Sequence, residues 1–256
     1  MRLFRRIAVS LSLYSRIPMP HFSWEEDDMK DSLMFFPLVG VIIGIVEVLA
    51  FHLCRYFELH HMVSVILMIL IPITITGGFH LDGFMDTTDA IRSYRSREDK
   101  LRILKDPHAG AFAVIGLICA LLAFAGAALV IYEKGDHLIM LNVGVSFVFS
   151  RSLSGLLSVI LPKARREGML HNETKGAGSR VMGTLLVWYI LSLIAVFVID
   201  PETALLTVAV YMACLIRYKN MTEKEFGGVT GDTAGYFVTV SEICNIVLLA
   251  LLCQVR

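Results

Sequence analysis

The sequence has few charged residues for its length and no excess of either sign. Charged residues fill 18% of the 256 positions, and 23 Lys and Arg balance 23 Asp and Glu. This balance excludes the broad basic surface on which nucleic-acid binding depends. The 56% of hydrophobic residues is more than a soluble domain of this size uses. Composition therefore indicates a protein of the lipid bilayer, with no nucleic acid as partner.

The five cysteines lack any pairing pattern. They are scattered, lie mostly inside apolar runs and include no CxxC pair. We therefore expect small buried side chains, and neither a disulfide framework nor a zinc site.

A convincing cleavable leader is also missing from the N-terminal segment. Basic residues precede a short apolar stretch, but Arg16 and two prolines interrupt it and no small-residue cleavage site follows. We predict that residues 1–30 form an amphipathic segment lying at the membrane interface.

Long apolar runs, in contrast, recur along the whole chain. A bilayer crossing requires about 20 residues, and seven runs are candidates. The chain is predicted to be an all-α, polytopic membrane bundle forming a single domain over residues 1–256, with polar loops at 80–110, 162–180 and 219–236. The predicted spans are 34–53, 62–79, 111–132, 138–160, 181–199, 203–218 and 237–253.

The distribution of Lys and Arg predicts an orientation. These residues accumulate in the N-terminal segment and in the loops 80–110 and 162–180, whereas the short connections near 54–61, 133–137 and 200–202 carry few. Because cytoplasmic loops retain positive charge, the N-terminus and all long loops are predicted to lie in the cytoplasm and the C-terminus outside.

The segment TGGFHLDGFMDTTDAIR carries the strongest chemical signal. Asp82, Asp86 and Asp89 stand at i, i+4 and i+7, a spacing that places three carboxylates on one helix face. Such carboxylates repel one another unless a cation neutralises them, and Mg²⁺ commonly joins carboxylates to substrate phosphates. A solvated acidic face is the simpler explanation. However, these acids directly follow a Gly-rich apolar run at membrane depth, where acids are usually functional.

Two further residues have a functional and a structural explanation of equal weight. His80, two positions before Asp82, is a candidate proton carrier or substrate contact, or a hydrogen-bonded interfacial histidine. Arg151, in the fourth predicted span, is a candidate anion contact, although snorkelling or pairing with Glu47 or Glu242 explains it as well.

The segment LKDPHAG precedes the third predicted span. Asp106 followed by Pro107 is typical of an N-cap and first-turn proline. Lys105, His108 and Gly110 add cationic groups and exposed amides, and a helix N-terminus is a favourable place for a phosphate. Capping alone and capping combined with a phosphate contact both remain open.

The last polar loop clusters glycines around Thr230 and Asp232, just before the final span. A Gly-rich stretch that enters a helix can hold phosphate through its N–H groups, although the Walker pattern is not present. The candidate phosphate-binding residues here are Gly228, Thr230, Gly231 and Asp232.

Taken together and in this order, these segments resemble the cobalamin synthase family, adenosylcobinamide-GDP ribazoletransferase. The resemblance runs nearly from end to end. Its motifs are RIPMP at 16–20, FPLVGVIIG at 36–44, TGGFHLDGFMDTTDA at 76–90, ILKDPHAG at 103–110, SRS at 150–152 and GGVTGDTAG at 227–235, followed by Glu242.

The resemblance implies a Mg²⁺-dependent membrane transferase of late cobalamin biosynthesis. Its substrates would be adenosylcobinamide-GDP and α-ribazole or its 5′-phosphate, and GMP would be released. Asp82, Asp86 and Asp89 would hold the metal, His80 or one of these acids would accept the hydroxyl proton, and Lys105, Asp106 and residues 230–232 would position phosphate. The implied location is the cytoplasmic (inner) membrane of a bacterium or archaeon, with the site facing the cytoplasm; assembly into a homo-oligomer is left open.

Two other functions are compatible with membrane acids. A CDP-alcohol phosphotransferase also carries spaced aspartates, but its signature places a glycine before the last two, and that order is missing here. An ion-coupled transporter would place acids at mid-span in pseudo-symmetric halves, whereas these acids crowd the inner ends of predicted spans.

Overall fold

The computed structural model describes residues 2–20, 31–165, 168–174 and 178–255. These residues are mostly helical, and the one strand-like pairing described among them is an isolated bridge between Lys163 and Val229. This confirms the predicted all-α fold class. The helices are α1 (Arg2–Tyr14), η1 (Ser32–Phe35), α3 (Phe36–Tyr56), α4 (His61–Thr76), α5 (Phe79–Arg92), α6 (Arg97–Ile103), α7 (Ala111–Lys134), α8 (His137–Ile160), α9 (Met169–Thr174), α10 (Ser179–Ile199), α11 (Pro201–Glu225) and α12 (Gly231–Val255).

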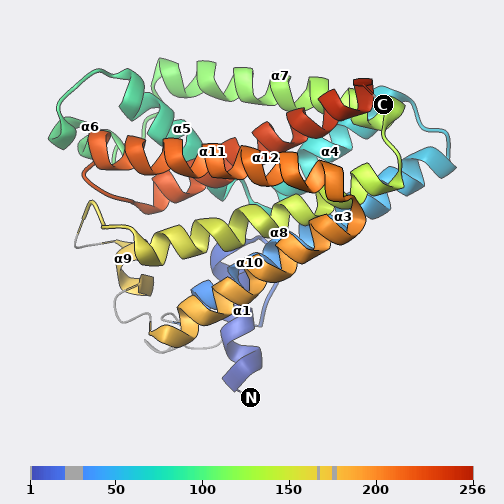
Figure 1. Ribbon diagram of the computed structural model, residues 1–256. Helices are drawn as coiled ribbons and strands as arrows, with labels where there is room; N and C mark the ends of the chain where they lie inside the picture. The colour runs from blue at the N-terminus through green and yellow to red at the C-terminus, as the bar shows by residue number, and fades with distance from the viewer. Residues whose placement is uncertain (1, 21–30, 166–167, 175–177, 256) are drawn as a thin grey trace.

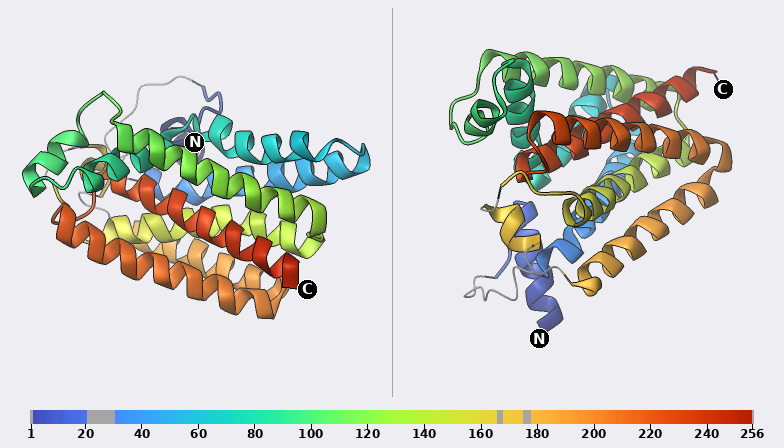
Figure 2. Two further views of the ribbon diagram at one scale, coloured as in Figure 1. Left: turned by 90° about the horizontal axis from the view of Figure 1, so that it is seen from above. Right: turned by 60° about the vertical axis from the view of Figure 1, so that its left-hand side comes forward.

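The long helices lie side by side in a bundle, with the polar segments gathered at one end (Figure 1). The short helices α5, α6 and α9 lie at this loop end, together with the turn from α11 to α12. The short connections α3–α4, α7–α8 and α10–α11 lie at the opposite end, as the views in Figure 2 also show. The fold therefore brings the polar loops together, as the sequence predicts.

Glycines allow the central helices of the bundle to approach closely. A Cβ added at Gly40 of α3 would lie 2.2 Å from the backbone oxygen of Phe147 in α8, and one added at Gly44 would lie 2.4 Å from that of Gly144. Small residues at helix contacts are typical of membrane bundles, where backbones meet directly. α3 and α8 thus form the tightly packed centre of the fold.

The predicted count of seven spans is not confirmed. Five helices in the described part of the chain are long and apolar enough to cross a membrane, and the bent pair α4–α5 makes a sixth if it is counted as one span. The sixth predicted span lies in α11, a continuous helix of 25 residues that ends in the polar run RYKNMTEKE and does not qualify. The predicted loop 219–236 is also too long, because α11 continues to Glu225 and α12 begins at Gly231.

Two spanning helices present most of their apolar surface to the outside. Only 22% of the apolar window of α7, and 17% of that of α10, is buried inside the protein. Contiguous exposed apolar surface of this extent is rare on soluble monomers. In a bilayer the same surface contacts lipid tails and not water, so its exposure is not unfavourable. The structure therefore indicates a multi-pass membrane protein.

Two glycines turn the chain sharply between α4 and α5. Gly77 and Gly78 have φ values of 66° and 80°, a left-handed conformation that glycine adopts without steric penalty. α4 ends there, three residues before the predicted limit of the second span, and α5 leaves at an angle of 93°. Because α5 lies with α6 at the loop end (Figure 1), we place it and its acids outside the membrane-spanning helices.

The N-terminal segment contains the predicted amphipathic helix. In α1, Ala8, Val9 and Leu11 are buried, whereas Leu3 and Phe4 are each 62% exposed. α1 packs on η1 and α3. Residues 21–30 of the predicted interfacial segment lie outside the described residues.

Candidate active site

Asp82, Asp86 and Asp89 share one face of α5, as their spacing predicts. An α-helix turns about 100° per residue, so these three side chains leave the helix axis within roughly 60° of one another. Asp82 is exposed, and Asp86 and Asp89 are half-buried. The loop end of the bundle therefore carries a partly desolvated acidic face.

Two glycines press α5 against the beginning of α12. A Cβ at Gly83 would lie 2.7 Å from the backbone oxygen of Asp232, and one at Gly235 would lie 3.1 Å from that of His80. The hydroxyl of Thr239 also donates to the His80 carbonyl, at 3.2 Å. This close contact brings Asp232, from the far end of the sequence, next to the acidic face of α5.

The pKa of Asp86 reflects the charges of the other acids at this end of the bundle. Partial burial, followed by the negative charge of Asp82, raises the pKa of the Asp86 carboxyl to about 6. The charges of Asp232, Asp89 and Asp106 act in the same direction. Like charges that raise a carboxyl pKa mark a place where a cation is favoured.

The acids do not form a complete metal site by themselves. In the described ranges, no three Asp, Glu, His or Cys side chains are grouped closely enough to hold an ion. Mg²⁺ usually keeps several waters and binds one or two carboxylates together with substrate phosphates. The donor chemistry of this face therefore fits Mg²⁺ that is shared with a phosphate ligand, and does not fit a closed protein cage.

The chain that follows α8 carries two cations, Lys163 and Arg165, which line a cavity together with Asp82 and Asp232. The Val229 N–H donates to the Pro162 carbonyl at 2.8 Å, and the Ala164 N–H donates to the Val229 carbonyl at 3.0 Å. A Cβ at Gly228 would lie 2.5 Å from the Pro162 oxygen, so this pairing requires glycine at position 228. It fixes the segment that carries Lys163 and Arg165 beside the end of the last polar loop.

Lys163 and Arg165 line a cavity of about 370 Å³. Burial lowers the pKa of both side chains, and the carboxylate of Asp232 opposes this change at Arg165. Removing a cation from water is unfavourable, and a bound anion offsets that cost. The cavity is suited to an anionic ligand. Its lining also includes Phe79, Asp82, Gly83, Thr230, Gly231 and Asp232.

Thr230 directly precedes the last helix, α12, and Gly231 is its first residue. The Thr230 hydroxyl accepts the Thr233 N–H at 3.2 Å, and the Thr233 hydroxyl accepts the Thr230 N–H at 2.9 Å. This reciprocal capping stabilises the first turn of α12. A Cβ at Gly231 would meet nothing within 4 Å, so the predicted Gly-rich region lies against open space at the cavity.

Asp106 does not cap α7, contrary to the prediction. The N-cap of α7 is Gly110, and no side chain caps it. The Asp106 carboxylate instead accepts the His108 N–H at 3.0 Å and contacts the His108 Nδ1 at 2.7 Å, which lowers the pKa of Asp106. Lys105 is exposed. Gly110, in the same predicted segment, lies against Asp89 of the acidic face.

His80 lies on the side of α5 opposite to the acids. Because His80 stands two residues before Asp82, its side chain leaves the helix axis roughly 160° away from that of Asp82. It is 6% exposed and stacks on Phe36 at 5.4 Å between ring centroids. Neither ring nitrogen has a hydrogen-bond partner within the described residues. The structure therefore does not bring His80 together with the three acids.

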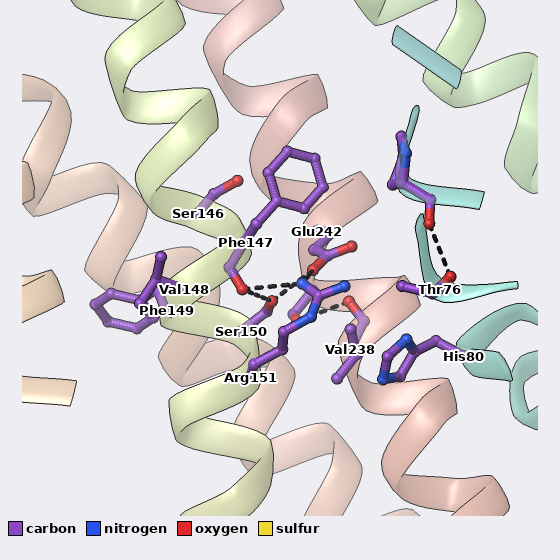
Figure 3. Close-up of polar contacts among 12 residues, drawn as sticks. Thr76, His80, Ser146, Phe147, Val148, Phe149, Ser150, Arg151, Val238 and Glu242 are labelled. Atoms are coloured by element: carbon purple, nitrogen blue, oxygen red, sulfur yellow. Dashed lines mark hydrogen bonds and ion pairs between the residues drawn. The ribbon is translucent and has the colours of Figure 1, made fainter. Parts of the chain in front are cut away.

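Arg151 lies in the core, where it pairs with Glu242 of α12 at 2.5 Å (Figure 3). Its guanidinium also donates to the Phe147 carbonyl at 2.9 Å, and Ser150 donates to Glu242 at 2.6 Å. Of the explanations that the sequence allows, the structure thus shows pairing with Glu242. Arg151 is 1% exposed and does not line the cavity beside Asp82.

Comparison with known proteins identifies the family of the chain. The sequence matches the family described as cobalamin-5-phosphate synthase over residues 6–251. A protein of Lachnoclostridium phytofermentans named adenosylcobinamide-GDP ribazoletransferase is 36% identical over 244 residues, which cover 95% of this chain and 92% of that protein. Proteins of the same name from Clostridium botulinum and Geobacillus thermodenitrificans are each 33% identical, covering 95% and 91% of this chain and 96% and 90% of their own lengths. No solved structure matches. The chain belongs to the cobalamin-5-phosphate synthase family.

Proposed function

We propose that the protein is an adenosylcobinamide-GDP ribazoletransferase. It would join adenosylcobinamide-GDP to α-ribazole or α-ribazole 5′-phosphate and release GMP, a late step of cobalamin biosynthesis. The family and the names of the relatives support the activity. The observation that carries the proposal is structural: Asp82 and Asp232 line the same cavity as Lys163 and Arg165, at the loop end of the bundle.

The proposed reaction exchanges one bond at phosphorus for another. A ribose hydroxyl of the acceptor attacks the phosphorus that bears the corrinoid side chain, and the bond from that phosphorus to the oxygen of GMP breaks. The protein has little covalent work to do and must mainly neutralise charge and align the reacting groups. Lys163 and Arg165 suit the oxygens of the diphosphate.

We propose Mg²⁺ as the cofactor; one or two of the carboxylates of Asp82, Asp86 and Asp89 would hold it together with the phosphates of the substrate. When bound, it neutralises charge on the diphosphate and on the leaving GMP. One of the acids on this face would also take the proton of the attacking hydroxyl. His80 is not kept in this role, because it lies on the opposite side of α5 and is buried.

We further propose that the protein lies in the cytoplasmic membrane of a bacterium or archaeon, with the acidic face toward the cytoplasm. The outward apolar surfaces of α7 and α10 support a bilayer. The excess of Lys and Arg in the long loops supports the orientation.

Turnover by the purified protein tests the activity and the metal together. The protein in detergent is incubated with adenosylcobinamide-GDP, α-ribazole 5′-phosphate and Mg²⁺, and the corrinoid product and GMP are separated by chromatography. Equal amounts of both products are expected, and none after chelation. Stoichiometric product formation in the presence of chelator would contradict the role of Mg²⁺, and absence of product under every condition would contradict the activity.

Asp82→Asn tests the acidic face. Loss of a carboxylate that would hold the charge-neutralising metal should lower kcat by about 10²- to 10³-fold. Glu98→Gln is the matched control, because Glu98 is an exposed acid of the neighbouring helix α6 and should turn over normally. GMP release at the wild-type rate by the Asp82 variant would remove Asp82 from the site.

A further inference from the structure

A second cavity, of about 550 Å³, adjoins the acidic face at the end of α1. It opens between the segment after α1 and the bend from α4 to α5. The Arg16 N–H donates to the Ile75 carbonyl at 2.7 Å, which attaches this segment to the end of α4. Phe79 and Asp82 line both this cavity and the one that holds Lys163 and Arg165.

The two cavities lie on opposite sides of Asp82. Viewed along the axis of α5, Gly83, which lines the first cavity, lies about 100° to one side of Asp82. Leu81 and Met85, which line the second cavity, lie about 100° and 60° to the other side. Displacement at phosphorus requires the attacking and leaving oxygens to be roughly in line on opposite sides of the phosphorus atom. A phosphorus near Asp82 would have one cavity on each side.

Arg16 is the cationic side chain of the second cavity. Its side chain crosses Gly77, where a Cβ would lie 2.5 Å from the Arg16 Cγ and 2.6 Å from its Nε. Arg16 is exposed, and within the described ranges no carboxylate forms an ion pair with it. A guanidinium positioned in this way is available to a phosphate.

We propose that the second cavity binds the ribazole acceptor and that Arg16 binds its 5′-phosphate, so that Arg16 sets the preference for the phosphorylated acceptor. This inference rests on the proposed function. Both substrates then carry phosphate to a face crowded with carboxylates, and each requires its own cation. The diphosphate carries more charge and suits the cavity with two cations, Lys163 and Arg165. The single phosphate of the acceptor suits the cavity with one.

Acceptor competition tests this assignment. For wild type and Arg16→Gln, kcat/KM is measured with α-ribazole 5′-phosphate and with α-ribazole at saturating adenosylcobinamide-GDP. Loss of one charge-assisted contact should reduce the ratio of the two values by about 10- to 100-fold, mainly through the KM of the phosphorylated acceptor. Arg16→Lys should restore part of the ratio. Arg95→Gln, at an exposed arginine of the same end, should leave the ratio unchanged.

The outcomes separate the two proposals. An unchanged ratio in Arg16→Gln, or an equal loss with both acceptors, would overturn the role of Arg16 and leave the transferase activity standing. No turnover of either acceptor by the wild-type protein would overturn the activity itself. Inorganic phosphate provides a measurement on the wild-type protein alone. It should inhibit competitively against α-ribazole 5′-phosphate, and purely noncompetitive inhibition would contradict an acceptor phosphate site.

Discussion

Gly110 shows how the absence of one methyl group positions a candidate catalytic carboxylate. A Cβ at this position would lie 2.2 Å from both carboxylate oxygens of Asp89, so Asp89 occupies the volume that any other side chain would need. The φ angle of Gly110 is −80°, which every residue adopts. Substitution therefore acts through steric conflict with Asp89, without backbone strain.

Gly110→Ala should consequently lower activity more than stability. The added methyl group moves the Asp89 carboxylate, and a displacement of about 1 Å at a reacting centre can cost about 10²-fold in rate. We expect kcat/KM to fall by roughly 10- to 100-fold. Unfolding in detergent should change little, because the short Asp89 side chain can rotate away from the added methyl group. Gly126→Ala in α7 is the control, since a Cβ there meets nothing within 4 Å. Normal turnover by the Gly110 variant would show that Asp89 can move without consequence.

At the scale of single residues, the sequence predicts the acids better than the cations. Asp82, Asp86 and Asp89 are recognisable because helical spacing alone places them on one face. Lys163 and Arg165 enter the sequence argument only as positive charges that orient a loop. Their position beside Asp82 depends on a backbone pairing between residues 162–164 and 229, a contact between distant segments that no local pattern encodes.

Among the helices, α8 and α12 are joined by a buried ion pair. Arg151 is 1% exposed, and Ser150 contributes a hydrogen bond to the same Glu242 carboxylate. Removing one partner of such a pair leaves an uncompensated charge away from water, whereas removing both can be nearly neutral. The pair therefore holds two helices in register, at a depth where each charge depends on the other.

Single and double substitutions test this interpretation. Arg151→Met and Glu242→Gln should each destabilise the protein, by about 3–5 kcal/mol where a charge is left unpaired, and the double variant should recover much of that loss. Unfolding in mixed detergent micelles provides the measurement, and Glu133→Gln, in an exposed pair with His61, provides the control. A double variant less stable than both single variants would contradict the interpretation that an unpaired charge causes the loss in each single variant. A stable double variant that binds substrate poorly would indicate that Arg151 contributes to the active site.

Helix boundaries near the site were the least predictable elements. The stretch GDTAG after Thr230 is glycine-rich and predicts a loop, yet it forms the first turns of α12. Its Gly235 serves helix packing, because α5 approaches the backbone there. Glycine used for close contact and glycine used for a turn have the same appearance in a single sequence.

For the molecule as a whole, the alternation of long polar and short connections predicts that the chemistry gathers at one end, and the bundle has this arrangement (Figure 1). The number of crossings was less predictable. α4 has only 16 residues and turns sharply into α5, and α11 carries a polar end on a long helix. Hydropathy alone does not distinguish such helices from complete spans.

Impermeant thiol labelling tests the orientation of the bundle. Single cysteines replace Glu98 of α6, at the loop end, and Phe57 after α3, at the opposite end, in a protein otherwise free of cysteine; both positions are exposed. Since the loop end carries most of the Lys and Arg, we expect intact cells to label Phe57→Cys alone and inverted vesicles to label Glu98→Cys alone. Permeabilised cells, in which both should react, control for accessibility. The reverse pattern would place Asp82 and its neighbours in the external medium and contradict the proposed cytoplasmic site.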